Sequence, residues 1–266
     1  MGPMDDKAVA VEVDARGVAS VVLSRPEVHN AFGEALIAEL TQVFKDLAAQ
    51  PEVRAVVLSG KGKSFSAGAD LNWMRRQSEA PEAENVADAM RLAEMLRGLW
   101  ELPKPTVARV HGPAYGGGVG LVAACDVAIA SQAALFSLSE VRLGLIPAVI
   151  SPYVTAAMGA RQAGRYAISG EVFEASAAQA IGLVHEVVAV DDLDAAVGRV
   201  IEDLLKCAPE AQADAKRLVR DVSSREIDDA LRQLTARRIA ARRATLEGRE
   251  GVAAFLEKRR PRWSRP

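Results

Sequence analysis

The sequence has little of what would mark a disulfide-stabilised, metal-binding or nucleic-acid-binding protein. Only two of its 266 residues are cysteine, which excludes a disulfide scaffold and leaves too few thiols for a cysteine-based metal cluster. The 33 basic residues are slightly outnumbered by 35 acidic ones, so the chain lacks the positive excess that is usual in nucleic-acid binders. No G-x-S-x-G motif is present, and no pair among the three histidines has zinc spacing. We therefore expect no metal and no serine-hydrolase chemistry.

Targeting and membrane signals are also scarce. The N-terminus carries acidic residues where a signal peptide would have a basic and then an apolar region, so we expect a cytoplasmic protein. The longest segment without a charged residue, 143–160, reaches only the lower limit for a membrane span. Because it contains Pro147 and Pro152, we expect a loop followed by a buried helix and no contact with a membrane.

What the chain does have is an alternation of strand and helix patterns. Residues 8–23 predict two short strands that turn at Gly17, and residues 34–48 have apolar side chains at helical spacing. Further strands are predicted at 55–59, 106–110 and 127–130, with helices near 85–101 and 116–124. This order favours an α/β domain. We expect a mixed core over residues 1–200 and a helical region over residues 201–266.

The first candidate site is the segment of small residues at 64–71. It follows a loop rich in glycine and lysine and leads into a predicted helix at Leu71. Small side chains let a ligand approach the backbone, and the unpaired N–H groups at a helix start can hold an anion. The alternative is a tight turn in which Asp70 only caps the helix.

The second candidate is the glycine triplet at 116–118, which follows a strand and opens a helix. It fits neither the dinucleotide fingerprint nor a phosphate-binding P-loop. It offers bare backbone N–H groups, although close packing of helix on sheet would also explain the glycines. Two such N–H groups from separate loops would form an oxyanion hole, in which losing one donor typically costs ~2.7–4 kcal/mol.

The third candidate is Glu140, an acidic residue among apolar neighbours. Burial would raise its pKa and suit it to proton transfer near neutral pH. An ion pair with Arg142 would instead leave it structural.

The C-terminal region is basic. Residues 232–262 hold ten Lys or Arg and three acidic residues. This charge could bind nucleic acid, form a solvated helix face, or contact the phosphates of a ligand.

In this order, the segments resemble the crotonase superfamily of enoyl-CoA hydratases and isomerases over nearly the whole chain. The matching stretches are 24–26 with 30–31, 65–71, 112–118, 124–126, 140 with 143–147, 182–184 and 251–259. The resemblance implies an α/β, crotonase-like spiral of ββα units with a helical C-terminal trimerisation region. It also implies a homotrimer or a dimer of trimers, an acyl-CoA thioester substrate, and no cofactor beyond the coenzyme A of the substrate.

The resemblance assigns roles to residues. It implies that the backbone N–H groups of Ala69 and Gly117 form the oxyanion hole, with Glu140 as the acid/base. It implies that Phe255 and Lys258 contact coenzyme A, often from a neighbouring subunit. The residues implied to bind substrate or coenzyme A are Val28, Ala31, Lys63, Ala67, Gly68, Asp70, Leu71, Tyr115, Gly116, Gly120, Phe255 and Lys258.

One position departs from the pattern of typical hydratases. They carry a second catalytic glutamate where this chain has Gly120. Residues 69–74, 118–121 and 138–153 look like bacterial methylglutaconyl-CoA hydratases, whose substrate is branched and carries a distal carboxylate. Gly120 would remove a charge that repels this carboxylate and open room for the branch. An enoyl-CoA isomerase, a general short-chain enoyl-CoA hydratase and, in a different class, an RNA-binding protein using the Arg-rich tail are the alternatives.

Overall fold

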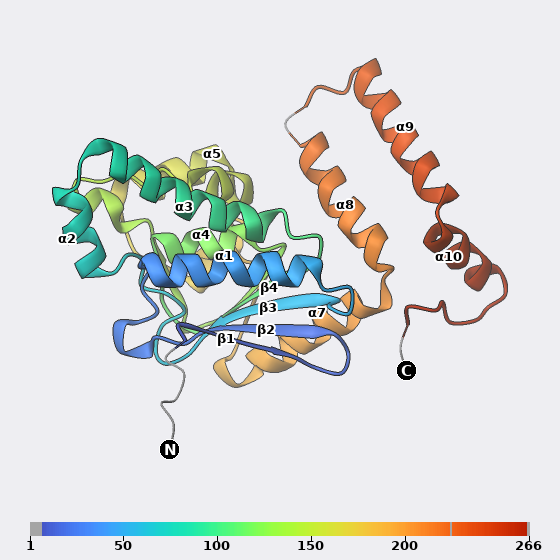
Figure 1. Cartoon of the computed structure of the whole chain (residues 1–266), viewed down its shortest axis with the longest axis horizontal. Coiled ribbons are helices and arrows are strands. Elements are labelled where there is room, and N and C mark those ends of the chain that lie inside the picture. Colours follow the sequence, from blue (N-terminus) through green and yellow to red (C-terminus); the bar gives the residue numbers. More distant parts are fainter. Residues whose placement is uncertain (1–6, 224, 265–266) are drawn as a thin grey trace.

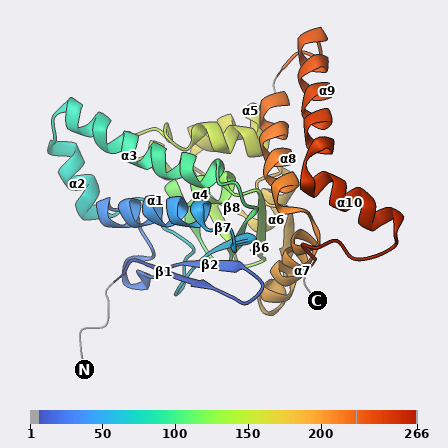
Figure 2. The same ribbon diagram turned by 45° about the vertical axis from the view of Figure 1, so that its right-hand side comes forward.

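The computed structural model describes residues 7–223 and 225–264. Two sheets form its centre, one of six strands in the order β1-β2-β3-β4-β6-β9 and one of three in the order β5-β7-β8 (Figures 1 and 2). The strands are β1 (Val9–Val13), β2 (Val18–Leu23), β3 (Ala55–Gly60), β4 (Thr106–Val110), β5 (Ala114–Tyr115), β6 (Val127–Ser131), β7 (Leu135–Ser137), β8 (Phe173–Glu174) and β9 (Glu186–Val188).

The helices separate and cover these strands. They are α1 (Glu34–Ala49), α2 (Leu71–Glu79), α3 (Glu82–Trp100), α4 (Gly117–Ala124), α5 (Ser151–Ser169), α6 (Ala175–Ala180), α7 (Leu193–Lys206), α8 (Pro209–Val222), α9 (Asp229–Ala244) and α10 (Leu246–Leu256). Short 3-10 turns lie at Pro26–Val28, Ser139–Leu143 and Val190–Asp192. The predicted α/β class is confirmed. No helix in the part of the chain that is described is long and apolar enough to cross a membrane.

The inner strands β2, β3, β4 and β6 of the larger sheet are largely buried on both faces, which explains their nearly continuous apolar sequences, whereas the edge strand β1 is mostly exposed. β1 and β2 form an antiparallel hairpin, while β2, β3, β4, β6 and β9 pair in parallel. In β3, Val56 and Leu58 face the main core beneath α1, α3 and α4, whereas Ala55 lies in a second cluster with α7. Parallel strands covered by helices on both faces lose the polar alternation of a half-exposed sheet.

The helical C-terminal region divides into two parts. Leu193, Ala196, Val197 and Ile201 of α7 pack against the sheet, so α7 belongs to the core. A division after residue 200 therefore falls inside α7, and the packing places the end of the core at the end of this helix. Helices α8, α9 and α10 extend away from the sheets (Figures 1 and 2).

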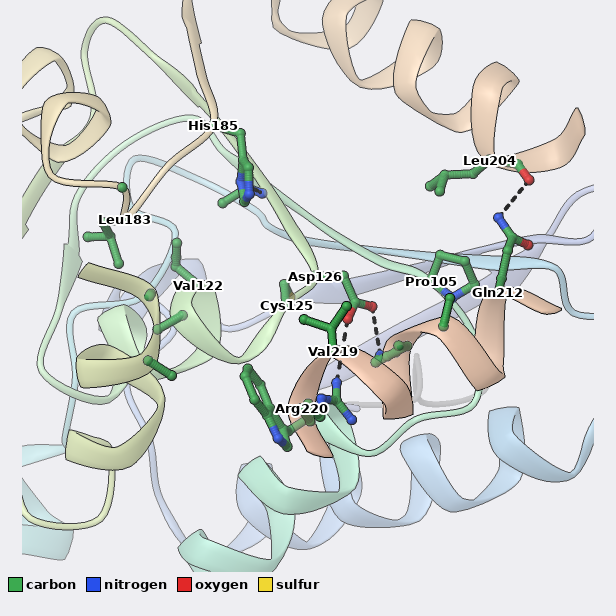
Figure 3. Close-up of a pocket in the computed structure, with 18 of the residues that line it drawn as sticks. Pro105, Val122, Cys125, Asp126, Leu183, His185, Leu204, Gln212, Val219 and Arg220 are labelled. Atoms are coloured by element: carbon green, nitrogen blue, oxygen red, sulfur yellow. Dashed lines mark hydrogen bonds and ion pairs between the residues drawn. The ribbon is translucent and has the colours of Figure 1, made fainter. Parts of the chain in front are cut away.

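An ion cluster fastens α8 to the core. Lys216 Nζ lies 2.6 Å from an Asp126 carboxylate oxygen, and Arg220 reaches the other oxygen at 3.5 Å (Figure 3). Thr106 donates to the same carboxylate from its N–H and its hydroxyl, each at 2.8 Å. The cluster borders a cavity of about 670 Å³ between α8 and the core. Neither Glu140 nor the glycine triplet lines this cavity, so we assign it to the attachment of α8.

Candidate active site

A buried asparagine holds the first two loops of the site together. Asn30, which is fully buried, donates from its side-chain amide to the carbonyls of Lys61 and Ser64, both at 2.9 Å. Its own carbonyl accepts from the hydroxyl of Ser66 at 2.9 Å. Its φ of 55° lies in the left-handed region, which asparagine tolerates better than most residues. One side chain thus fixes the 25–31 loop against the 61–66 loop.

The Ala69 amide is left free by a short parallel bridge. Phe32 donates to the Gly68 carbonyl at 2.6 Å, and Asp70 donates back to the Phe32 carbonyl at 2.7 Å. In this pattern the residue between the two bonded partners directs its own N–H to the opposite side. Among the described residues, no acceptor for the Ala69 N–H is found.

The Gly117 amide is the first of α4. The first N–H groups of a helix have no partner within it, and the described chain provides no other acceptor for Gly117. The two amide-bearing segments lie against each other. A Cβ built on Gly68 would come within 3.0 Å of the Tyr115 carbonyl oxygen, and one on Gly117 within 2.9 Å of the Phe32 ring. The fold therefore brings Ala69 and Gly117 to one place, around Phe32.

Glu140 lies directly over the start of α4. It sits in the 3-10 turn Ser139–Leu143, and a Cβ on Gly116 would approach its carboxylate oxygen to 3.0 Å. Gly116 has a φ of 49°, so glycine is required here by both backbone angle and space. The second carboxylate oxygen of Glu140 is buried and has no hydrogen-bond partner within the described residues.

Burial raises the pKa of the Glu140 carboxyl above its ordinary value, because desolvation disfavours the charged form. Within the described residues, Glu140 forms no ion pair with Arg142 or with another cation, so the alternative of a pair with Arg142 is wrong. A partly buried carboxyl without a cationic partner, next to two free amides, can take up and release a proton at a bound thioester.

Gly120 does not open room. A Cβ there would meet Ile150 Cγ2 at 2.4 Å and Ile150 Cβ at 2.9 Å. The expectation of free space for a substrate branch is therefore wrong, because the buried Ile150 side chain fills it. The position still carries no charged side chain, because Gly120 and Ile150 are both uncharged. Sequence reasoning missed Ile150, and no local pattern marks it, since it comes close to α4 only through the fold.

The other predicted residues differ in their surroundings. Asp70 caps α2, accepting from the N–H groups of Asn72 and Trp73 at 2.9 and 3.2 Å, and its other oxygen lies 3.6 Å from Arg25. The capping alternative is therefore confirmed, and a direct substrate contact by this side chain stays a prediction. Ala31, Gly68 and Gly116 are buried, Val28, Ala67 and Tyr115 are half-buried, and Lys63 and Leu71 are exposed.

Phe255 and Lys258 are not at this site in the same subunit. They lie at the end of α10, at the opposite end of the molecule from α2, whose first turn follows Ala69 (Figure 1). Phe255 is 81% exposed. The expected contact of these residues with coenzyme A stays a prediction.

Much of the basic C-terminal charge is neutralised internally. Arg242 pairs with Glu210 at 2.8 Å and Asp214 at 2.9 Å, and also with Glu247. Arg259 pairs with Glu250 at 2.7 Å. Acidic residues upstream of residue 232 thus offset charge that a local count leaves unbalanced, which weakens the nucleic-acid interpretation.

Comparison with known proteins places this site in a family. Residues 14–266 match the enoyl-CoA hydratase/isomerase family. The crystal structure of an enoyl-CoA hydratase from Shewanella pealeana is 44% identical, with a TM-score of 0.93 over 96% of both chains. An enoyl-CoA hydratase of Alternaria alternata is 34% identical over 93% of this chain and 81% of its own. The mevalonyl-coenzyme A hydratase sidH of Aspergillus fumigatus is 32% identical over 91% of this chain and 90% of its own.

The family match spans β2 to β9, the helices and the three segments that meet around Glu140, and the solved relative has the same fold over almost its entire length. The chain therefore belongs to the enoyl-CoA hydratase/isomerase family of the crotonase superfamily, whose members act on acyl-CoA thioesters.

Proposed function

We propose that the protein catalyses the reversible syn hydration of a branched enoyl-CoA, interconverting 3-methylglutaconyl-CoA and 3-hydroxy-3-methylglutaryl-CoA. The observation that carries this proposal is the single carboxylate of Glu140, lying over Gly116 beside the free amides of Ala69 and Gly117. Glu140 has the placement and the raised pKa that proton transfer requires.

In the proposed reaction, the Ala69 and Gly117 N–H groups hold the thioester oxygen. The Glu140 carboxylate accepts a proton from water while the water oxygen bonds to C3, and the electron pair of the double bond moves to the thioester oxygen as an enolate. Glu140 then returns its proton to C2 and the enolate collapses. Because one carboxyl group performs both transfers, the hydrogen and hydroxyl add from the same face.

The charge around α4 supports a carboxylated substrate. At Gly120, where typical hydratases place a second glutamate, this chain presents the apolar Ile150 side chain. Two like charges close together in a site of low dielectric constant repel strongly. The similarity to the mevalonyl-coenzyme A hydratase of Aspergillus fumigatus supports a substrate branched at C3. A mevalonyl group carries a methyl and a hydroxyl group on C3, as does the hydration product proposed here.

We further propose that the enzyme works in the cytoplasm as a homotrimer or a dimer of trimers. The far position of α10 supports this, because only a neighbouring subunit could bring Phe255 and Lys258 to the coenzyme A. The loop between α8 and α9 also exposes Ile227, and α10 exposes Leu246 and Leu256, at 85%, 86% and 72%. Apolar side chains exposed in this way are typical of protein interfaces.

The test is a turnover panel with product masses. Crotonyl-CoA, 3-methylcrotonyl-CoA and 3-methylglutaconyl-CoA are each incubated with the purified protein. We expect the highest kcat/KM with 3-methylglutaconyl-CoA and a product heavier by one water. A preference for crotonyl-CoA would indicate a general short-chain hydratase, and a product of unchanged mass would indicate an isomerase. Either result would reject the proposed function.

A further inference from the structure

We propose that Ile150 determines acyl specificity, forming a wall between the reaction centre and an apolar cavity that the wild-type enzyme does not use. This inference rests on the proposed function of the same site. Ile150 is apolar and belongs to no ligand-binding motif. Its role follows from its contacts with Gly120 on one side and with the cavity on the other.

Ile150 lies close to the proposed reaction centre, against Gly120 of α4. Gly116 and Gly120 are four residues apart, and the Gly120 N–H donates to the Gly116 carbonyl at 3.2 Å. The two glycines therefore lie on one face of α4, about 6 Å apart along the helix axis. Glu140 covers this face at Gly116 and Ile150 covers it at Gly120. The isoleucine methyl groups thus stand one helical turn from the catalytic carboxylate.

Behind Ile150, a cavity of about 220 Å³ lies between α5 and the segment that carries Glu140. Its lining includes Leu138, Pro147, Val154, Ala163 and Ala167 together with Ile150 itself. The lining is mostly apolar, with hydroxyl groups only from Ser151 and Thr155, so the cavity suits a hydrocarbon chain. Gly120 and Glu140 do not line it.

Ile150 therefore lies between the Gly120 face of α4 and the apolar cavity. Truncation to alanine removes three carbon atoms and should join the cavity to the site, so that acyl chains longer than the five carbons of the proposed substrate gain a place to bind. In apolar pockets, one methylene typically changes specificity ~10-fold or more. The native substrate class would accordingly have short substituents on C3.

The experiment measures chain-length preference in two ways. For wild type, Ile150→Val and Ile150→Ala, kcat/KM is determined with 2-octenoyl-CoA and with crotonyl-CoA. The Kd values of the saturated analogues, octanoyl-CoA and butyryl-CoA, are determined by calorimetry. We expect the octenoyl-to-crotonyl ratio to rise at least ~10-fold in Ile150→Ala and less in Ile150→Val, with a parallel shift in the ratio of Kd values.

Ile129→Ala is the matched control. Ile129 is equally buried but lies in the cluster between the sheet and α7, so it should lower stability without changing either ratio. Unchanged ratios in both Ile150 variants, or an equal change in Ile129→Ala, would overturn the inference. The Kd ratios test whether Ile150 limits acyl-chain length even if the wild-type enzyme hydrates no enoyl-CoA. That absence of turnover would reject only the proposed function.

Discussion

The packing of α4 on the Ser66 segment allows a sharp prediction for Gly118→Ala. A Cβ at Gly118 would lie 2.5 Å from the Ser66 carbonyl oxygen, about 0.9 Å closer than the 3.4 Å at which ordinary contact begins. The obstacle is backbone, and Ser66 is itself held by the N–H of Tyr115 at 2.9 Å. The start of α4 must therefore move by close to 1 Å relative to the segment that carries Ala69.

Such a shift would separate the two proposed oxyanion donors. A misplacement of about 1 Å can cost ~100-fold in rate, and overpacking of a dense core typically costs ~1–3 kcal/mol of stability. We expect Gly118→Ala to lower kcat/KM about 100-fold and to lower the free energy of unfolding in that range. Loss of the conjugated-thioester absorbance measures the rate, and urea titration measures the stability.

Gly198→Ala in α7 is the matched control for this substitution. Nothing lies within 4 Å of a Cβ built at that position. Alanine in a helix is favoured over glycine by ~1 kcal/mol, so this variant should gain stability and keep its activity. Wild-type kinetics in a folded Gly118→Ala protein would refute the argument that this contact sets the position of the donors.

Three further predictions follow from local contacts. Asp70→Ala removes the cap of α2 and should cost ~1 kcal/mol in a urea titration, most of it restored by Asp70→Ser; no loss would contradict the capping role. Glu140→Gln should raise the melting temperature at pH 7. Burial raises the pKa of the Glu140 carboxyl in the folded protein above the ordinary 4.5, so the stability of the wild-type protein falls as pH rises from about 4.5 through that raised pKa. The pH-dependent part of the difference in melting temperature between the variant and wild type should vanish below pH 4.5. A wild-type protein more stable than Glu140→Gln at neutral pH would show that the Glu140 carboxylate is not desolvated. Gly120→Glu alone should impair folding through its clash with Ile150, whereas Gly120→Glu with Ile150→Gly should fold and lose more activity on 3-methylglutaconyl-CoA than on crotonyl-CoA; the reverse order would contradict the charge argument.

Periodicity was sufficient to predict the elements that pack as regular units. The helix near residues 34–48 is α1, because Leu36, Leu40 and Phe44 share one buried face. The strand at 55–59 is β3, recognisable as a short apolar run between turn signals. These elements depend on local patterns that the sequence carries directly.

Contacts across the fold could not be read in the same way. The glycine triplet indicated free amides or close packing, and the structure has both: Gly117 offers an amide, while Gly118 packs on Ser66. The filling of the Gly120 space by Ile150 joins residues thirty positions apart through α4 and the start of α5. No one-dimensional spacing encodes such a contact. For the same reason, residues 232–262 alone do not predict the pairing of Arg242 with Glu210 and Asp214, which lie outside that stretch.

In the proposed mechanism one carboxyl group, Glu140, moves both protons at a thioester held by two backbone amides. The most direct measurement compares kcat for wild type and Glu140→Gln with 3-methylglutaconyl-CoA, with circular dichroism showing that both are folded. Loss of general acid–base catalysis typically costs ~100- to 10,000-fold, and we predict a decrease in that range. A folded Glu140→Gln protein that turns over at the wild-type rate would contradict the account.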